Sequence, residues 1–330
     1  MIDSKETPVL LILFNRVSIS NELLKSLREA KPKTIYIFFD GPRDQKKHSD
    51  QSSINLIEQD INEIIDWECD LFIKRNKNNV GSHVGPKQAI DWFFSKEVRG
   101  IILEDDCIPD KYFFEYCNEL LSVYESNKKI FMISGDNAGP IVNEDLFNPN
   151  SYLFTKIPLT WGWATWKDRW DKLDQNFDTW SKKTTANKRY LNEFSLYENL
   201  IIQKMLRRVS SREEKNWDYV LYSTMIKNNC YSIMPKYNLI RNIGWGEEAT
   251  HTKEKNFRSF GTTKKINMLN FYGEIKNSID LDTRISYMAH FGISQNLAIN
   301  GNLNLIRIIH LFKRLRYFIF IVYKKLTKFI

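Results

Sequence analysis

The sequence predicts an α/β fold in which a mostly parallel sheet carries helices on both faces, as in Rossmann-like proteins. Short, almost continuous apolar runs recur through residues 1–135, and amphipathic segments of helical periodicity separate them. Continuous apolar runs indicate strands covered on both faces, and their alternation with helices indicates parallel pairing. With 42% hydrophobic residues, a chain of 330 residues can bury a full core.

The expected elements follow one another in a regular order. The first apolar run, TPVLLILFNR, predicts a strand, and Ser18 or Ser20 is expected to cap the helix after it. Helices are then expected at 18–30, 54–65, 78–94 and 110–126. Strands are expected within 7–16, 33–43, 69–75, 98–106 and 129–135.

The chain changes character after Gly135, where loops, aromatic residues and mixed helices replace the regular alternation. No linker or low-complexity segment marks a boundary. We therefore expect one fold with an α/β half at 1–135, a divergent half at 136–303 and a basic tail at 304–330.

The net charge of +8 is concentrated in the tail, which contains seven Lys or Arg and no acid. The preceding 303 residues are therefore nearly neutral, which argues against a nucleic-acid partner. The four cysteines form no CxxC pair, so neither a disulfide framework nor a zinc site is indicated. The opening MIDSKETP lacks the basic and apolar regions of a secretory signal, and we expect a cytoplasmic protein.

Polar residues follow the predicted strands at the point where each strand ends. Arg16 follows the first, Asp40 the second and Arg75 the third, and three consecutive acids follow the fourth. Ligands of wound sheets bind beyond the carboxyl ends of the strands. A single strand-end acid is more often a turn cap, but the four together favour a site.

The acids Glu104, Asp105 and Asp106 repel one another unless a positive charge lies near them. Alternation along an extended segment places Glu104 and Asp106 on one side and Asp105 on the other. Carboxylate oxygens suit Mg²⁺ or Mn²⁺, which retains water and substrate phosphates as ligands. The triplet therefore predicts a site for a divalent ion bound to a diphosphate.

Several other nucleotide and hydrolytic chemistries lack their motifs. The sequence has no GxGxxG after the first strand, no GxxxxGK[ST] and no GxSxG. A dinucleotide oxidoreductase, a P-loop phosphotransferase and a serine hydrolase are therefore not indicated.

A series of landmarks resembles the GT-A glycosyltransferases. In order, the chain shows FNR, a strand ending in Asp40, EDD with PDKYFFEY, PLTWGWATW, NWDYVL and PKYNLIRNIGWGEEATHT. This order, over residues 8–252, is similar to the β-1,2-N-acetylglucosaminyltransferase I family and to bacterial transferases of surface-polysaccharide biosynthesis. The resemblance implies a UDP-sugar donor, Mn²⁺ or Mg²⁺, and a glycan or lipid-linked glycan acceptor. It makes 1–135 the nucleotide-sugar-binding half and 136–303 the acceptor-binding and catalytic half.

The resemblance also implies roles for individual residues. Asp106 matches the metal ligand of the DxD motif, and Asp218 matches the base of an inverting reaction. One departure concerns Asp91, which stands where the family has a nucleotide-contacting His, so the uridine is less well supported than the diphosphate. The residues implied to bind the donor are Arg16, Asp40, Lys87, Glu104, Asp105 and His251.

Asp218 keeps several interpretations at this stage. A general base must take the proton of an acceptor hydroxyl as its oxygen attacks the anomeric carbon, and Trp217 beside Asp218 would raise the proton affinity of the carboxylate. Asp218 is equally suited to cap the helix that begins in NWDYVL. A retaining transferase and a non-catalytic nucleotide- or glycan-binding module therefore remain alternatives.

The tryptophans near residue 165 suggest two roles. Trp163, Trp166 and Trp170 have helical spacing, which indicates core packing for Trp166 and Trp170. Trp161 and Trp163 flank a glycine ahead of that helix, and an indole face there could stack on an acceptor sugar. We therefore expect Trp161 and Trp163 to bind the acceptor.

The basic tail has no uncharged run longer than the seven residues Tyr317 to Tyr323, far short of the ~20 needed to cross a bilayer. It is expected to lie as an amphipathic helix on the inner face of the membrane. Packing on the body or on a second subunit, as in a homodimer, is the alternative.

Overall fold

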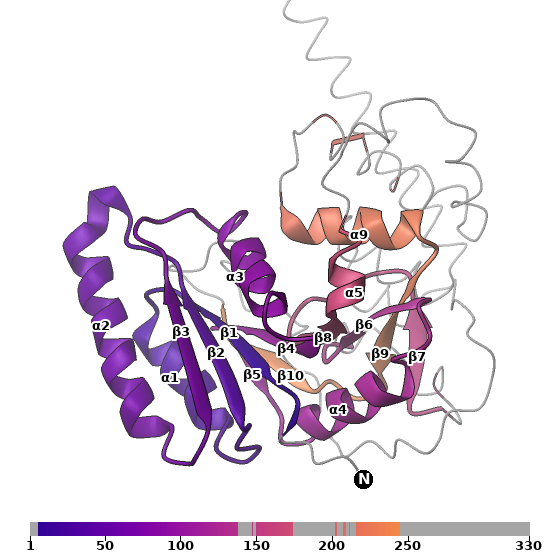
Figure 1. Cartoon of the computed structure of the whole chain (residues 1–330), viewed down its shortest axis with the longest axis horizontal. Coiled ribbons are helices and arrows are strands. Elements are labelled where there is room, and N and C mark those ends of the chain that lie inside the picture. Colours follow the sequence, from indigo (N-terminus) through magenta and orange to yellow (C-terminus); the bar gives the residue numbers. More distant parts are fainter. Residues whose placement is uncertain are drawn as a thin grey trace, which may run out of the picture.

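The described chain folds around one large sheet that has helices on both faces (Figure 1). The computed structural model describes residues 6–137, 147, 150–173, 202, 207–208, 211 and 216–244. Within the predicted 136–303 segment, residues 174–201 and 245–303, including His251, lie outside the described residues, as does the tail at 304–330.

The large sheet contains eight strands among the described residues, in the order β3-β2-β1-β4-β8-β6-β9-β7. The first four strands pair in parallel, whereas β8 is antiparallel to both of its neighbours and β7 is antiparallel to β9. This confirms the predicted α/β fold with a mostly parallel sheet. The strands are β1 (Val9–Leu13), β2 (Thr34–Phe39), β3 (Asp70–Arg75), β4 (Arg99–Glu104), β6 (Ile130–Ser134), β7 (Tyr152–Thr155), β8 (Trp163–Trp166) and β9 (Tyr231–Pro235).

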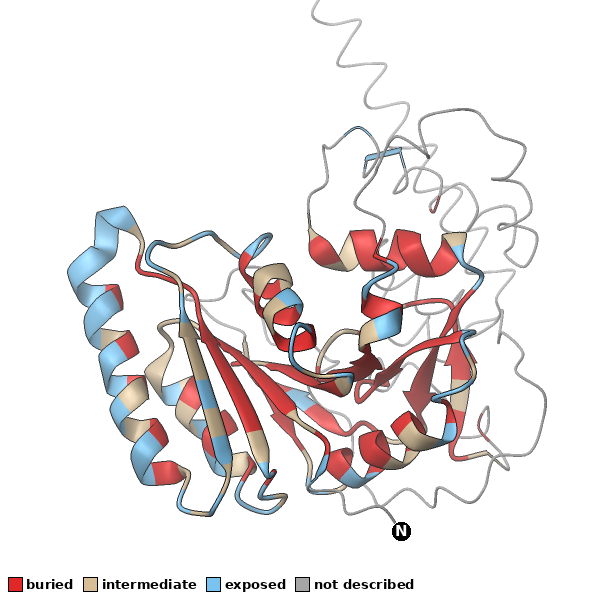
Figure 2. Ribbon diagram, in the orientation of Figure 1, coloured by how far each residue is buried: buried red, intermediate tan, exposed pale blue. Residues whose placement is uncertain are grey.

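Burial explains why the apolar runs became strands. Every residue of β1 and β6 is buried, because helices cover both faces of the central sheet (Figure 2). Continuous apolar sequence is what a strand covered on both faces requires. β3, at one edge, is only partly covered, and its mixed sequence DLFIKR matches that position.

The helices divide into two layers according to the side of the sheet on which they pack. Apolar residues of α1 (Val17–Ser26), α2 (Lys47–Ile64) and α4 (Phe113–Val123) share one core. Residues of α3 (Gly85–Phe94), α5 (Lys167–Trp170) and α9 (Trp217–Lys227) form the core on the opposite face. Within the described parts of the chain, no helix has the length and apolar composition that crossing a membrane requires.

The predicted starts of two helices are wrong. α1 begins at Val17 with Arg16 at its N-cap, so neither Ser18 nor Ser20 caps it, and Ser20 is buried inside the helix. α2 begins at Lys47, seven residues before the predicted Ile54, because a polar first turn continues the same helix. Amphipathic periodicity identifies the helix interior better than its polar ends.

The prediction that the tryptophan repeat lies on one helix is also wrong. Trp163–Trp166 is strand β8, and only Lys167–Trp170 is helical. Gly162 precedes the strand with a φ of +58°, a conformation that glycine adopts readily, and a Cβ there would lie 2.3 Å from the Ile240 side chain. The four-residue spacing of Trp166 and Trp170 thus spans a strand end and one helical turn.

A second, two-stranded sheet forms next to the carboxyl end of β4. β5 (Cys107–Pro109) directly follows the acid triplet and pairs antiparallel with β10 (Ile240–Asn242). This pairing brings the segment around residue 242 from the other end of the described chain to the acids. No periodic pattern predicts either strand, since each has only three residues.

Candidate functional site

The acid triplet lies at the point where the winding of the sheet changes direction. β1 lies between β2 and β4, so the chain moves outward from β1 to β3 and then returns to add β4 on the other side. Ligands of wound sheets bind in the crevice outside the carboxyl ends of the strands at such a switch point. Arg16 follows β1 and the acids end β4, so both arrive at this crevice.

Arg16 supplies the positive charge that the acid triplet lacks in sequence. Its guanidinium forms a two-pronged ion pair with Asp105, in which Nε donates over 2.9 Å, and its Nη2 donates to Asp106 over 3.0 Å. The triplet is therefore stabilised within the protein by one partly buried arginine. The predicted convergence of the first and fourth strand ends is confirmed by this contact.

Protonation of Glu104 would lower the repulsion among the three acids further. Burial is the main cause that raises the pKa of Glu104 to about 8, and the charges of Asp106, Asp105 and Asp218 add to the rise. Burial also raises the pKa of Asp105 to about 6, although Arg16 opposes this shift. Near neutral pH the raised pKa of Glu104 favours its protonated form beside the ion pair of Asp105 and Arg16.

Of the two aspartates paired with Arg16, Asp106 is the more available to a ligand. Its side chain is 18% exposed, whereas that of Asp105 is 6% exposed and is occupied by Arg16. No group of three or more His, Cys, Asp or Glu side chains among the described residues has the geometry of a metal site. Asp106 therefore fits a cation that brings most of its own ligands, and the protein alone does not form a complete cation cage.

Two residues that sequence reasoning missed hold Asp106 in place. Asn242 donates from its side-chain amide to one Asp106 oxygen over 3.3 Å, and its own carbonyl oxygen accepts from the Gly244 backbone over 2.9 Å. The backbone of Gly244 lies so close that an added Cβ would be 2.0 Å from Asp106 Oδ2. The NIGWG motif contains the glycine signal, but only the β5–β10 pairing shows which acid it faces.

Asp218 approaches the same cluster from α9. It lies in the first turn of the helix, one residue after Trp217, and its negative charge contributes to the raised pKa of Glu104. The alternative of Asp218 as helix cap is wrong in position, because Asn216 is the N-cap residue. The side chain accepts a hydrogen bond from the Tyr219 backbone over 2.9 Å.

Asp40 lies at the end of β2, but protein donors occupy its carboxylate. Its 9% exposure leaves little room for a ligand. The donors surround it from the loop after β3 and from its own turn, and thereby fix that loop against the end of β2. They are the backbone N–H groups of Gly41, Val80 and Gly81 and the side-chain amides of Asn76 and Asn79. The contact between Asp40 and a nucleotide-sugar stays a prediction.

Lys87 and Asp91 pair with each other on α3. The Lys87 ammonium donates to Asp91, and the indole N–H of Trp170 donates to the other Asp91 oxygen over 2.8 Å. Asp91 therefore joins α3 to α5. The predicted donor contact of Lys87 stays a prediction.

The two tryptophans predicted to bind the acceptor differ in burial. Trp163 is 1% exposed and stacks on Trp217 with ring centroids 5.8 Å apart, so its indole has no face for a sugar. Trp163 is thus a core residue, and the prediction of acceptor binding is corrected for it. Trp161 is only partly buried and lies beside the end of β4, because Trp163 pairs with Ile102 in antiparallel register.

Asp50 is a further residue that the sequence analysis missed. It is 2% exposed and accepts hydrogen bonds from the Asn15 amide and from the backbone and guanidinium of Arg43. Because Asn15 precedes Arg16, this contact fixes the segment that presents the guanidinium. A signal was present, since Asp50 continues the apolar stripe of Ile54, Ile57 and Ile61 on α2, where an acid is unusual.

Comparisons with known proteins add no family to this description. No protein-family model matches the chain, and no curated protein matches it.

Proposed function

We propose that the protein is a metal-dependent glycosyltransferase of the GT-A fold. It moves a hexosyl or N-acetylhexosaminyl group from a nucleotide-diphosphate donor, in particular a UDP-sugar, to a glycan or lipid-linked glycan hydroxyl. The observation that carries the proposal is the cluster of Asp105, Asp106 and Arg16 at the switch point of the sheet, with Asp218 acting electrostatically on the same cluster. Residues far apart in sequence thus meet where wound sheets bind ligands.

The chemistry of Asp106 suits a divalent ion that arrives with the donor. The more exposed carboxylate would hold Mn²⁺ or Mg²⁺, and the diphosphate and water would complete the ligand set. When bound, such an ion neutralises the negative charge of the departing diphosphate. The Arg16 guanidinium, 3.0 Å from Asp106, offers a second positive charge on the same side.

Asp218 is the proposed general base of an inverting reaction. As the acceptor oxygen bonds to the anomeric carbon, the bond from that carbon to the diphosphate oxygen breaks, and the hydroxyl proton moves to Asp218. Trp217, 7% exposed, stacks with Trp163 beneath the helix start, so one side of the Asp218 surroundings is apolar. An apolar environment increases the proton affinity of a carboxylate.

The acceptor side of the site is proposed to include Trp161, the half-buried indole beside the end of β4. The basic tail, 304–330, suits contact with anionic lipid at the inner face of the membrane, where a lipid-linked acceptor would be found. His251, in the GWGEEATHT segment, is proposed to contact the donor diphosphate.

A panel of nucleotide-sugars, assayed for release of the nucleotide diphosphate with Mn²⁺ and a glycan acceptor, tests the proposal. We expect release with one donor, loss of release with EDTA and loss of the Mn²⁺ response in Asp106→Asn. Asp218→Asn is expected to lower kcat about 10²–10⁴-fold with little change in KM for the donor. Asp66→Asn, whose partner Arg28 forms an exposed ion pair with it, is the matched control.

The same assay separates the alternatives. A product that retains the anomeric configuration of the donor, together with an active Asp218→Asn variant, would favour a retaining transferase. Nucleotide binding without turnover for any donor would favour a binding module. Release that is insensitive to EDTA and to Asp106→Asn contradicts the proposed role of the acid cluster.

A further inference from the structure

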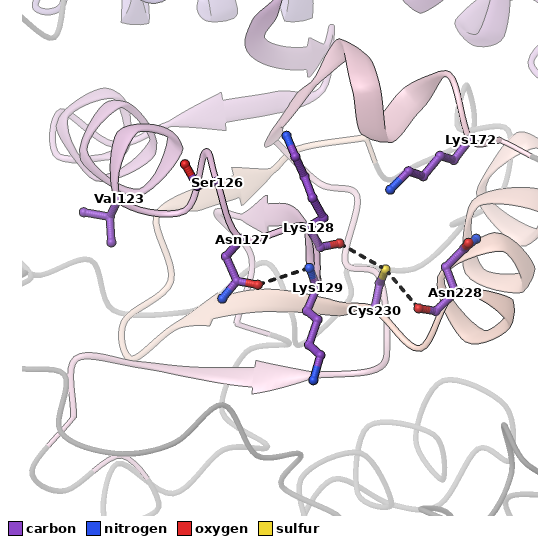
Figure 3. A pocket seen from close by; sticks show the side chains of 8 residues that line it. All are labelled: Val123, Ser126, Asn127, Lys128, Lys129, Lys172, Asn228 and Cys230. Carbon is purple, nitrogen blue, oxygen red and sulfur yellow. Dashed lines mark hydrogen bonds between the residues drawn. The ribbon is translucent and has the colours of Figure 1, made fainter.

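A pocket of about 1080 Å³ lies at the amino ends of β6 and β9 (Figure 3). It is lined by Val123 at the end of α4, by residues 126–129 before β6, by Lys172 after α5, and by Asn228 and Cys230 between α9 and β9. β4, β6 and β9 run in the same direction. The amino ends of β6 and β9 therefore face this pocket, whereas the acids follow the carboxyl end of β4.

The lining of the pocket is cationic. It contains Lys128, Lys129 and Lys172 and no acidic residue. Lys128 pairs with Asp168 over 2.8 Å, whereas the ammonium groups of Lys129 and Lys172 have no carboxylate partner in the described part of the chain. Figure 3 shows the Lys128 and Lys172 side chains extending on the same side of the Cys230 sulfur, with Lys129 extending to the other.

Two buried cations add to the charge behind this surface. Arg169 is 1% exposed, donates to the Tyr124 carbonyl oxygen over 3.1 Å and lies 4.1 Å above the Trp166 ring. Lys156 is also 1% exposed and donates to the Asn229 side chain. The charges of Lys172, Lys156 and Arg169 all act on the Cys230 thiol and oppose the rise in its pKa that burial causes. The three cations therefore lie close to the floor of the pocket.

The negative carboxyl ends of two helices offset only part of this positive charge. α4 and α9 both end at the pocket, and each carboxyl end carries about half a negative charge. Lys128 offsets the negative end of α4 by donating to the Glu125 carbonyl oxygen over 3.2 Å. Asp168 pairs with both Lys128 and Arg169, whereas Lys129 and Lys172 have no carboxylate partner among the described residues, so the lining keeps a positive charge.

We propose that this pocket binds a phosphate-bearing anion between the ammonium groups of Lys128 and Lys172, with the Asn228 amide as a further donor. Ammonium groups bind phosphate oxygens as point charges, and several of them together retain an anion that one surface lysine does not. A soluble diphosphate and a phospholipid headgroup share this chemistry. The site is separate from the diphosphate site of the proposed function, because the two lie at opposite ends of the parallel strands.

Titration calorimetry of the full chain with inorganic pyrophosphate, in EDTA and at low salt, tests the proposal without a metal in the acid cluster. A second arm measures co-sedimentation with phosphatidylcholine vesicles prepared with and without phosphatidylglycerol. We expect Lys172→Gln to weaken anion binding about fivefold, and the Lys128→Gln, Lys172→Gln double variant about 25-fold. Lys167→Gln is the control, because Lys167 lies close in sequence to Lys172, on α5, but does not line the pocket and is paired with Asp171.

Each outcome has a defined meaning. Pyrophosphate binding that depends on Lys172 supports a soluble phosphate ligand, and lysine-dependent binding to the anionic vesicles alone supports a lipid headgroup. Binding in either arm that the double variant leaves unchanged, or no binding in both arms, overturns the proposal. Asp106→Asn is expected to retain pyrophosphate binding in EDTA, so a failure of the glycosyltransferase proposal is visible separately.

Discussion

Gly244 shows how a single residue determines the shape of the candidate site. Its backbone passes directly over Asp106, and its N–H donates to the side-chain oxygen of Asn242. The side-chain NH2 group of Asn242 in turn donates to Asp106. The close approach leaves no space for a side chain. Asp106, the more exposed of the two aspartates paired with Arg16, is therefore oriented by a strand that no local sequence signal links to it.

Gly244→Ala is expected to disturb this orientation. The added methyl would lie 2.0 Å from Asp106 Oδ2, so either the carboxylate or the strand must move. Overpacking of this kind destabilises by about 1–3 kcal/mol, which a urea denaturation curve would measure. In the enzyme that we propose, the apparent Mn²⁺ affinity should also fall. Unchanged stability together with unchanged Mn²⁺ affinity would contradict the contact.

At the scale of elements, α2 does more than cover the sheet. Its buried acid, Asp50, connects the segment after β1 to the segment after β2 through Asn15 and Arg43. The Arg43 guanidinium also lies 5.3 Å from the centre of the Phe14 ring. One carboxylate on a helix thus holds together the strand ends that present Arg16 and Asp40.

Asp50→Asn tests this connection through its pH dependence. Hydrogen bonds from Arg43 are the main cause that lowers the Asp50 pKa from 3.8 to about 2. The stabilisation is therefore present above pH 3.8 and is lost as the pH falls through 2. At pH 6 the variant should be less stable by about 2 kcal/mol, and the difference should shrink below pH 4.

Urea denaturation of both proteins at several pH values between 2 and 6 would measure this difference. Asp66→Asn removes an exposed ion pair with Arg28 and should change stability by less than about 1 kcal/mol at every pH. A wild-type-to-variant difference that is independent of pH would show that Asp50 acts through packing, without a contribution from its charge.

At the scale of the whole molecule, the sequence predicted the half that repeats one local pattern. The alternation of apolar runs with helices was sufficient to locate β1 to β4, and the carboxyl-end rule brought Arg16 to the acids. The antiparallel strand β8 between β4 and β6 was missed, because the short apolar run WATW fits a buried strand and a buried helix equally well. The Asp50 and Asn242 contacts were missed because each joins segments brought together only by tertiary packing.

The missed strand also connects the acid cluster to the proposed base. β8 carries Trp163, whose ring stacks at 17° to that of Trp217, the first residue of α9. Trp170 packs near both rings, at 6.2 Å from Trp163 and 6.4 Å from Trp217. The distance of Asp218 from Glu104 thus depends on an aromatic cluster between the sheet and the helix.

Trp163→Ala should therefore affect both stability and the proposed reaction. Removal of a fully buried indole is expected to lower stability by about 3–5 kcal/mol, measured by thermal and urea unfolding. Loss of the stacked pair should also weaken the near-UV circular dichroism, and the α9 start should lose its support. The proposed transferase should then lose kcat more than donor affinity, because Asp218 moves while Arg16 and Asp106 stay on the sheet. Trp163→Phe keeps an aromatic ring in the cluster and should retain part of each property. An alanine variant with the stability, spectrum and kcat of the wild type would show that α9 is held by other contacts.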